Sequence, residues 1–99
     1  MIKTEITEKL GIKYPLVGGT MMGISDADFV AAIANAGGLG IIASAIYKSK
    51  EDFAAAIDQA QSQTKEPFAV NINLFPAVSA IDNNEYVDVM IDKGVTIVE

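Results

Sequence analysis

The 99-residue sequence predicts a parallel α/β fold, in which βα repeats form the N-terminal portion of a (β/α)8 barrel, or TIM barrel. Short apolar segments alternate with amphipathic segments of helical spacing, as in parallel sheets. The apolar segments begin near residues 14, 39, 68 and 95, and a repeat of about 27 residues is usual for a βα unit. Eight such units would need about 220 residues, so we expect residues 1–99 to be a single partial domain, the first half of a barrel.

The first predicted strand follows a charged segment, residues 3–10, that predicts a short helix. This strand covers Tyr14–Val17 and ends at Gly18 and Gly19, because paired glycines interrupt a strand.

The first repeat helix is predicted from Ser25 to Ala36. A serine followed three residues later by Asp28 resembles a capping box, apolar side chains recur at helical spacing, and Gly37 ends the helix. The continuous apolar run Leu39–Ala43 then predicts a strand that is buried on both faces.

The same pattern occurs twice more, because Ser49 and Asp82 each precede a carboxylate by three residues and begin a helix. The predicted apolar faces are Phe53, Ala56, Ile57 and Ala60 in the second helix, and Tyr86, Val89 and Met90 in the third. The strands that follow are Phe68–Leu74, after Pro67, and Val95–Val98, after Gly94. Strand and helix therefore alternate from the first strand to the fourth, with right-handed crossovers.

A second architecture stays open, a complete doubly wound sheet of four strands. It would leave the strand at 95–98 as an unprotected edge unless another chain covered it. The barrel is favoured because the sequence ends in an apolar strand with no helix after it.

The composition excludes several classes of function. Thirteen acidic residues against seven lysines give a net charge of −6, so no basic patch is expected to bind nucleic acid or an anionic membrane. The apolar stretch 31–46 is too short and interrupted to span a bilayer, and the charged N-terminus is not a secretory signal. We therefore expect a cytoplasmic protein.

The predicted site lies where the strands end, because βα loops converge at the C-terminal edge of a parallel sheet. Glycines in the first loop, Gly18–Gly23, let a planar ligand or phosphate approach the backbone, where Thr20 and Met21 could present N–H groups. Alternatively, the glycines only form a turn, and Met21 and Met22 fill gaps in the core.

Two amides mark the third strand. One face carries Ala69, Asn71 and Asn73 and points inward in a barrel, and the other carries Val70, Ile72 and Leu74 and packs on helices. A buried amide without a hydrogen bond costs about 2–7 kcal/mol, so Asn71 and Asn73 indicate a ligand. Alternatively, they bond to each other or to loop backbone.

Small residues end the second strand, where Ala43, Ser44 and Ala45 leave space beside the site. The acidic residues fall mostly at helix starts, where the helix dipole explains them. Cysteine and histidine are absent, so the chain has no Ser-His-Asp triad, cysteine nucleophile or zinc site. We predict no catalytic residue and no metal ligand within these 99 residues.

Five short motifs occur in a specific order and spacing: Gly11–Pro15, Gly19–Met21, Asn35–Ile42, Pro67–Asn71 and Lys93–Val98. Together they make the sequence, from Ile2 to its end, similar to the N-terminal part of the nitronate monooxygenase family, formerly called 2-nitropropane dioxygenases. Flavin-dependent enoyl-acyl-carrier-protein reductases share this scaffold and much of the pattern.

The resemblance implies a TIM barrel that binds FMN non-covalently and oxidises alkyl nitronates with O2 to a carbonyl compound and nitrite. By position, Gly19, Thr20 and Met21 match the loop that lies against the isoalloxazine ring, and Asn71 matches an asparagine that hydrogen-bonds the flavin. The family's catalytic histidine and phosphate-binding loops belong to later strands, so the resemblance implies that the catalytic residues lie beyond residue 99. We therefore expect the 99 residues alone to turn over no substrate.

Met22 and Asn73 are added as cofactor-binding candidates from geometry alone. Two other functions stay open. One is a flavin-dependent enoyl-acyl-carrier-protein reductase, which would consume NAD(P)H with an acyl thioester. The other is a non-catalytic half-barrel that self-associates through its open sheet edges.

Overall fold

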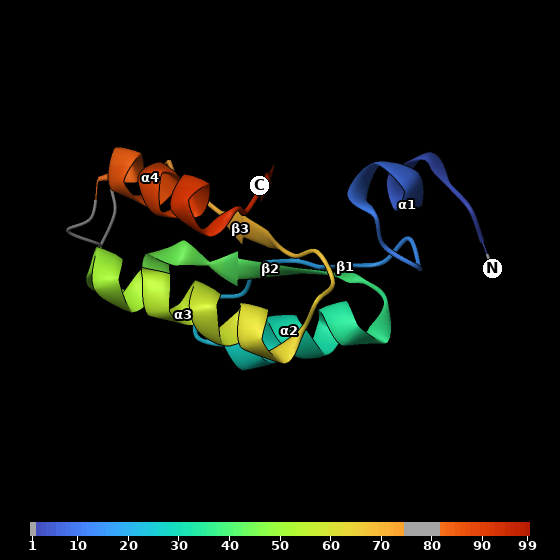
Figure 1. Ribbon diagram of the computed structural model, residues 1–99, viewed down its shortest axis with the longest axis horizontal. Helices are drawn as coiled ribbons and strands as arrows, with labels where there is room; N and C mark the ends of the chain where they lie inside the picture. The colour runs from blue at the N-terminus through green and yellow to red at the C-terminus, as the bar shows by residue number, and fades with distance from the viewer. Residues whose placement is uncertain (1, 75–81) are drawn as a thin grey trace.

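The computed structural model describes residues 2–74 and 82–99, and these residues contain one parallel sheet in the order β1-β2-β3-β4 (Figure 1). The strands are β1 (Val17–Gly18), β2 (Leu39–Ala43), β3 (Ala69–Asn71) and β4 (Ile97–Val98). The helices that connect them are α2 (Ala27–Ala36), α3 (Lys50–Gln63) and α4 (Asn83–Lys93), with the short 3-10 helix η1 (Ser44–Ile46) after β2. The alternation of strand and helix is therefore as predicted.

The three connecting helices cover the same face of the sheet. One buried cluster joins Val30 of α2, Phe53 of α3 and Tyr86 of α4 to Ile42 and Val70 of the sheet. A doubly wound sheet reverses its strand order and carries helices on both faces. The structure therefore confirms the N-terminal portion of a (β/α)8 barrel, and the doubly wound alternative is wrong.

The opposite face carries a second buried cluster, made by Leu39, Ile41 and Ala69 together with Ile12. Leu10, at the end of α1 (Glu5–Leu10), packs against this cluster. In Figure 1, α1 lies at the end of the sheet where the strands begin. The N-terminal helix therefore covers the strand starts and leaves the strand ends to the connecting loops.

The start of α2 differs from its prediction by one residue. The N-cap is Asp26, whose Oδ1 accepts a hydrogen bond of 2.9 Å from the backbone N–H of Phe29. Ser25 is buried instead, and its Oγ accepts from the backbone N–H of Met21 at 2.8 Å. Both Ser25 and Asp26 have side chains that could cap the helix. Asp26 is the cap because the hydroxyl of Ser25 already accepts a hydrogen bond from the preceding loop.

The other two predicted helix starts are confirmed. The Oγ of Ser49 accepts from the backbone N–H of Asp52 at 3.1 Å. Asp82 and Glu85 form a reciprocal capping box at the start of α4. Such caps satisfy N–H groups that have no partner within the helix.

β2 covers the predicted range Leu39–Ala43, whereas the pairing of the other three strands covers only part of the predicted apolar runs. β1 covers 17–18 rather than 14–17, β3 covers 69–71 rather than 68–74, and β4 covers 97–98 rather than 95–98. Leu74 is 85% exposed, so the prediction that it packs on helices is wrong. Val70 belongs to the buried cluster between the sheet and the three connecting helices, here called the helix-side cluster, and Ile72 packs against it, as predicted.

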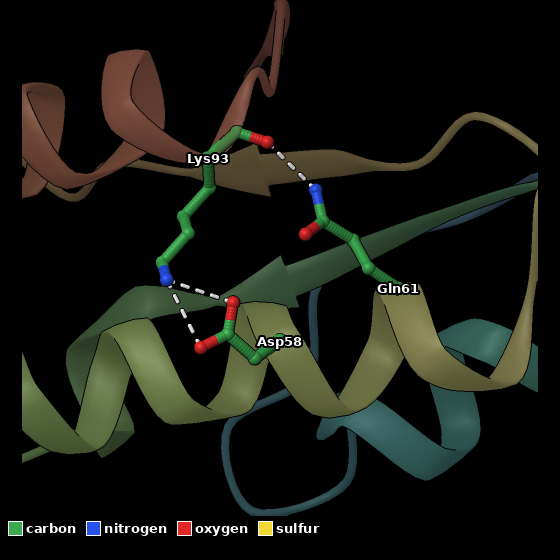
Figure 2. A network of polar contacts seen from close by, with 3 residues as sticks. All are labelled: Asp58, Gln61 and Lys93. Atoms are coloured by element: carbon green, nitrogen blue, oxygen red, sulfur yellow. Dashed lines mark hydrogen bonds and ion pairs between the residues drawn. The ribbon is translucent and has the colours of Figure 1, made fainter.

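A polar network joins the ends of α3 and α4 (Figure 2). The Nζ of Lys93 lies 2.8 Å from Oδ1 and 3.0 Å from Oδ2 of Asp58. The Nε2 of Gln61 donates to the backbone carbonyl of Lys93 at 2.7 Å. Exposed ion pairs contribute about 0–1 kcal/mol, so this ion pair adds little to the stability of the chain.

A second carboxylate joins α2 to α3 and makes stability depend on pH. The Oδ1 of Asp28 accepts from the Nε2 atoms of Gln63 and Gln59, each at 2.6 Å. These hydrogen bonds, Gln63 first, hold the pKa of Asp28 below its ordinary value of 3.8. The stabilisation is therefore fully present above the unfolded-state pKa, and it is lost as the pH falls through the lower folded-state pKa.

We expect the free energy of unfolding of Asp28→Asn to fall less steeply below pH 3.8 than that of the wild-type chain. Urea unfolding at a series of acidic pH values measures this slope. Asp92→Asn, which removes an exposed carboxylate of α4, is the control and should keep the wild-type slope. Equal slopes in Asp28→Asn and the wild type would show that Asp28 does not contribute to the acid sensitivity.

Candidate functional site

The strand ends lie at one edge of the sheet, where the predicted site residues follow β1, β2 and β3 (Figure 1). Asn71 ends β3 and is half-buried, and Thr20 follows β1 by two residues and is also half-buried. Ala69 belongs to the buried cluster on the face without connecting helices. Because side chains alternate along a strand, Asn71 shares that face.

Thr20 and Asn71 meet at Glu99. Its Oε1 accepts a hydrogen bond of 2.9 Å from the Oγ1 of Thr20 and one of 3.0 Å from the Nδ2 of Asn71. In a flat sheet, three inter-strand distances would separate β1 from β4 by about 14 Å. The contact between Thr20 and Glu99 therefore indicates a sheet that curves toward this face, as in a barrel.

Sequence reasoning missed Glu99, because most acidic residues stand at helix starts and this one follows a strand. The available signal was its position. Ile97 packs on the second buried cluster, which lies on the sheet face without connecting helices. Glu99 is two residues after Ile97, so its side chain shares that face. Its backbone N–H donates to the carbonyl of Val70 at 3.0 Å, and its carbonyl accepts from the N–H of Ile72 at 3.1 Å. These bonds continue the pairing with β3 and hold Glu99 beside Asn71.

Hydrogen bonds within the loop after β1 use the backbone N–H of Met21, which was expected to face a ligand. The backbone N–H of Met21 donates to Ser25, so it is not presented to a ligand as predicted. The carbonyl of Met21 accepts from the N–H groups of Ile24 and Ser25 at 3.0 and 2.9 Å. The side chains of Met21 and Met22 are exposed, so the alternative that they fill the core is wrong.

The other predicted residues lie as follows. Gly19 is exposed, and a Cβ built there would meet no atom within 4 Å, so its surroundings are open. Asn73 is half-buried, and its carbonyl accepts from the Nδ2 of Asn83 at 3.5 Å. Ala43 and Ser44 are buried, so the space expected at the end of β2 is filled. The cofactor-binding roles of Gly19, Met22 and Asn73 stay predictions.

The Oγ of Ser44 is buried and has no hydrogen-bond partner in the part of the chain that the structure describes. Ala43 precedes it, and the N–H of Ala43 donates to the carbonyl of Ser25 at 3.2 Å. This bond ties the end of β2 to the loop after β1. The loops that follow β1 and β2 are therefore held together at the C-terminal ends of the strands, where the site is predicted.

A groove of about 440 Å³ lies elsewhere, between the start of α2 and α3, and Asp26, Tyr47 and Asp52 are among its lining residues. Burial raises the pKa of Tyr47, with smaller contributions from the negative charges of Asp26 and Asp28. None of the predicted site residues lines this groove. The groove is therefore separate from the predicted site at the C-terminal ends of the strands.

Two further properties concern the described residues 2–74 and 82–99. They contain no group of three or more His, Cys, Asp or Glu side chains that could hold a metal ion. They also contain no helix with the length and apolar character needed to cross a membrane.

A curved parallel sheet whose loops bring polar side chains together at the strand ends is the arrangement of (β/α)8-barrel enzymes. The family model for nitronate monooxygenase matches residues 3–98. The chain therefore belongs to the nitronate monooxygenase family.

Two relatives and one solved structure show how far the similarity extends. The (3aS,4S,5R,7aS)-5-hydroxy-7a-methyl-1-oxo-octahydro-1H-indene-4-carboxyl-CoA dehydrogenase of Mycobacterium tuberculosis is 41% identical over 97% of this chain and 26% of its own length. The nitronate monooxygenase of Pseudomonas aeruginosa is 42% identical over 70% of this chain and 19% of its own. FabK from Thermotoga maritima has a TM-score of 0.85 and 32% identity over 99% of this chain and 30% of its own. The chain thus spans 19–26% of the length of these two curated relatives.

Proposed function

We propose that this chain is the N-terminal portion of an FMN-dependent oxidoreductase that oxidises alkyl nitronates with O2 to a carbonyl compound and nitrite. In this proposal Gly19, Thr20 and Met21 lie against the isoalloxazine ring, and Asn71 hydrogen-bonds the flavin. The observation that carries the proposal is the convergence of Thr20 and Asn71 on Glu99 at the strand ends. Membership of the nitronate monooxygenase family supports the reaction class.

The chain's own residues would bind and orient the flavin rather than perform the chemistry. FMN supplies the two-electron oxidation when bound, and Asn71 and Thr20 supply side-chain hydrogen bonds at the C-terminal ends of the strands. The activity, with a small nitronate and O2 as partners, belongs in this proposal to a longer protein that contains this portion. We propose a cytoplasmic location, because disulfides are rare in cytoplasmic proteins and this chain has no cysteine.

An FMN titration of the purified chain tests the proposal, with flavin fluorescence and visible absorbance as readouts. We expect saturable binding, and we expect Asn71→Ala to weaken it about tenfold, because one hydrogen bond to the flavin is lost. Asn35→Ala is the matched control. Asn35 lies near the C-terminal end of α2, and its Nδ2 donates to the backbone carbonyl of Gln63, the last residue of α3. Absence of binding at high micromolar FMN would mean that the chain is not itself a flavoprotein.

The second candidate is an oxidoreductase acting on an acyl thioester, such as the enoyl-acyl-carrier-protein reductase considered above. It is favoured by the name of the Mycobacterium tuberculosis relative, a carboxyl-CoA dehydrogenase. Assays of the longer protein distinguish the two reactions. Oxygen uptake with an alkyl nitronate supports the first candidate, and NAD(P)H consumption with a crotonyl thioester supports the second.

The sheet edges favour a further property, self-association of the chain. β1 and β4 are the edge strands, and apolar residues on them and beside them are exposed, among them Leu16 at 67%, Val17 and Val98. Exposed edges present unpaired N–H and C=O groups to another chain. We therefore propose that the isolated chain pairs with a second copy through these edges.

Light scattering measures this association directly. We expect a mass above that of the monomer, and a lower mass for Val17→Lys, because a charge on an edge strand opposes pairing. Val87→Lys introduces the same charge at an exposed position of α4 and should leave the mass unchanged. A wild-type chain that is monomeric in dilute buffer would contradict the proposal.

A further inference from the structure

Glu99 makes the two hydrogen bonds that join the candidate flavin-binding residues, and the nitronate monooxygenase proposal assigns it no role. Both bonds use the same carboxylate atom, Oε1, at 2.9 Å from Thr20 and 3.0 Å from Asn71. The backbone of Glu99 is held by β3 through Val70 and Ile72. The carboxylate therefore has a defined position between two strand ends.

The chemistry of a carboxylate decides how Asn71 is oriented. An ionised carboxylate only accepts hydrogen bonds, whereas the amide of asparagine has a donor end and an acceptor end. The Nδ2 end of Asn71 must therefore face Glu99, which directs the carbonyl oxygen Oδ1 away from it.

The same argument applies to Thr20. A threonine hydroxyl has one proton to donate, and here that proton lies toward Glu99. What remains on Oγ1 for a ligand is a pair of acceptor sites. Glu99 therefore leaves Thr20 with acceptor sites only, and it turns the acceptor end of Asn71, whose Nδ2 keeps a second N–H, away from itself.

We propose that Glu99 is a positioning residue, which orients Asn71 and Thr20 so that the site binds an N–H donor of its ligand. This inference rests on the proposed function, because the ligand is taken to be FMN. The isoalloxazine ring of oxidised flavin carries a single N–H, at N3, and its other ring heteroatoms accept. The geometry thus assigns the N3–H of the flavin to the acceptors that Glu99 orients.

Two ligands test the donor requirement, FMN and its N3-methyl derivative, which lacks that proton. We expect the wild-type chain to bind FMN about tenfold more tightly than N3-methyl FMN, as for one hydrogen bond. In Glu99→Gln the side chain both donates and accepts, so Asn71 can present either end. The preference should then fall to about twofold or less.

Glu66→Gln is the matched control, since it removes one negative charge from the exposed segment before β3, at the opposite end of the strands. It should keep the wild-type preference for FMN. An unchanged preference in Glu99→Gln, or equal binding of the two flavins by the wild-type chain, would overturn the proposed donor recognition.

A measurement without flavin separates this inference from the proposed function. In the wild-type chain, one side-chain amide proton of Asn71 donates to the carboxylate of Glu99, and its resonance should shift in Glu99→Gln, where a neutral amide replaces the charged acceptor. Identical side-chain amide resonances of Asn71 in the wild type and in Glu99→Gln would overturn the positioning role even if FMN binds. If the shift is seen but FMN does not bind, the positioning role stands and the flavin proposal fails.

Discussion

Gly40→Ala is expected to destabilise the chain by about 3 kcal/mol, because β2 and α2 are in backbone contact at this position. A Cβ built on Gly40 would lie 2.6 Å from the carbonyl oxygen of Val30 and 2.9 Å from its Cα. Backbone atoms cannot rotate away as a side chain can, so α2 would have to move off the sheet. Small domains have about 5–15 kcal/mol of stability, and this loss is a large part of it.

Urea unfolding measures the effect as a lower midpoint at unchanged slope. The matched control is Gly19→Ala, since a Cβ at Gly19 would meet nothing within 4 Å. Its free energy of unfolding should stay within about 0.5 kcal/mol of the wild type. A Gly40→Ala chain with the wild-type midpoint would show that α2 does not pack on β2 as closely as described. A chain with no cooperative transition would agree with the prediction.

Phe53→Ala should destabilise the chain by about 3–5 kcal/mol. Phe53 is 0% exposed and lies at the centre of the helix-side cluster. Its ring meets that of Tyr86 edge to face, with 5.0 Å between centroids and an interplanar angle of 88°. Truncation removes both the buried area and a ring contact that contributes about 0.5–1.5 kcal/mol.

Two variants make the measurement of this core position specific. Phe53→Leu keeps most of the apolar volume and should cost less than half as much as Phe53→Ala. Phe29→Ala truncates a phenylalanine of α2 that is 36% exposed, and it should also cost less than half as much. Equal losses for Phe53→Ala and Phe29→Ala in urea unfolding would contradict the central position of Phe53.

The caps show where sequence reasoning has enough information and where it does not. Ser49 and Asp82 were identified correctly, because a cap involves only the next three residues. At α2, Ser25 and Asp26 are adjacent and both could cap. The choice of Asp26 depends on the loop after β1, whose Met21 N–H uses Ser25.

The strand lengths show the same difference. The apolar run 68–74 marks β3, but its pairing with β2 ends at Asn71, which lies opposite Ala43, the last residue of β2. A strand needs a partner that no local pattern contains, so its ends are set by its neighbours. The exposed Leu74 is the direct consequence.

The sequence by itself determined the order of the elements, the parallel class of the sheet and the opposite facing of Ala69 and Val70. These features depend on residues a few positions apart, and on the periods of two and 3.6 residues that follow from backbone geometry. Only the tertiary structure decided that Glu99 joins Thr20 to Asn71, and that Gly40 must be a glycine beneath Val30. Such contacts arise when a curved sheet and a docked helix bring distant residues together, and no local pattern encodes that distance.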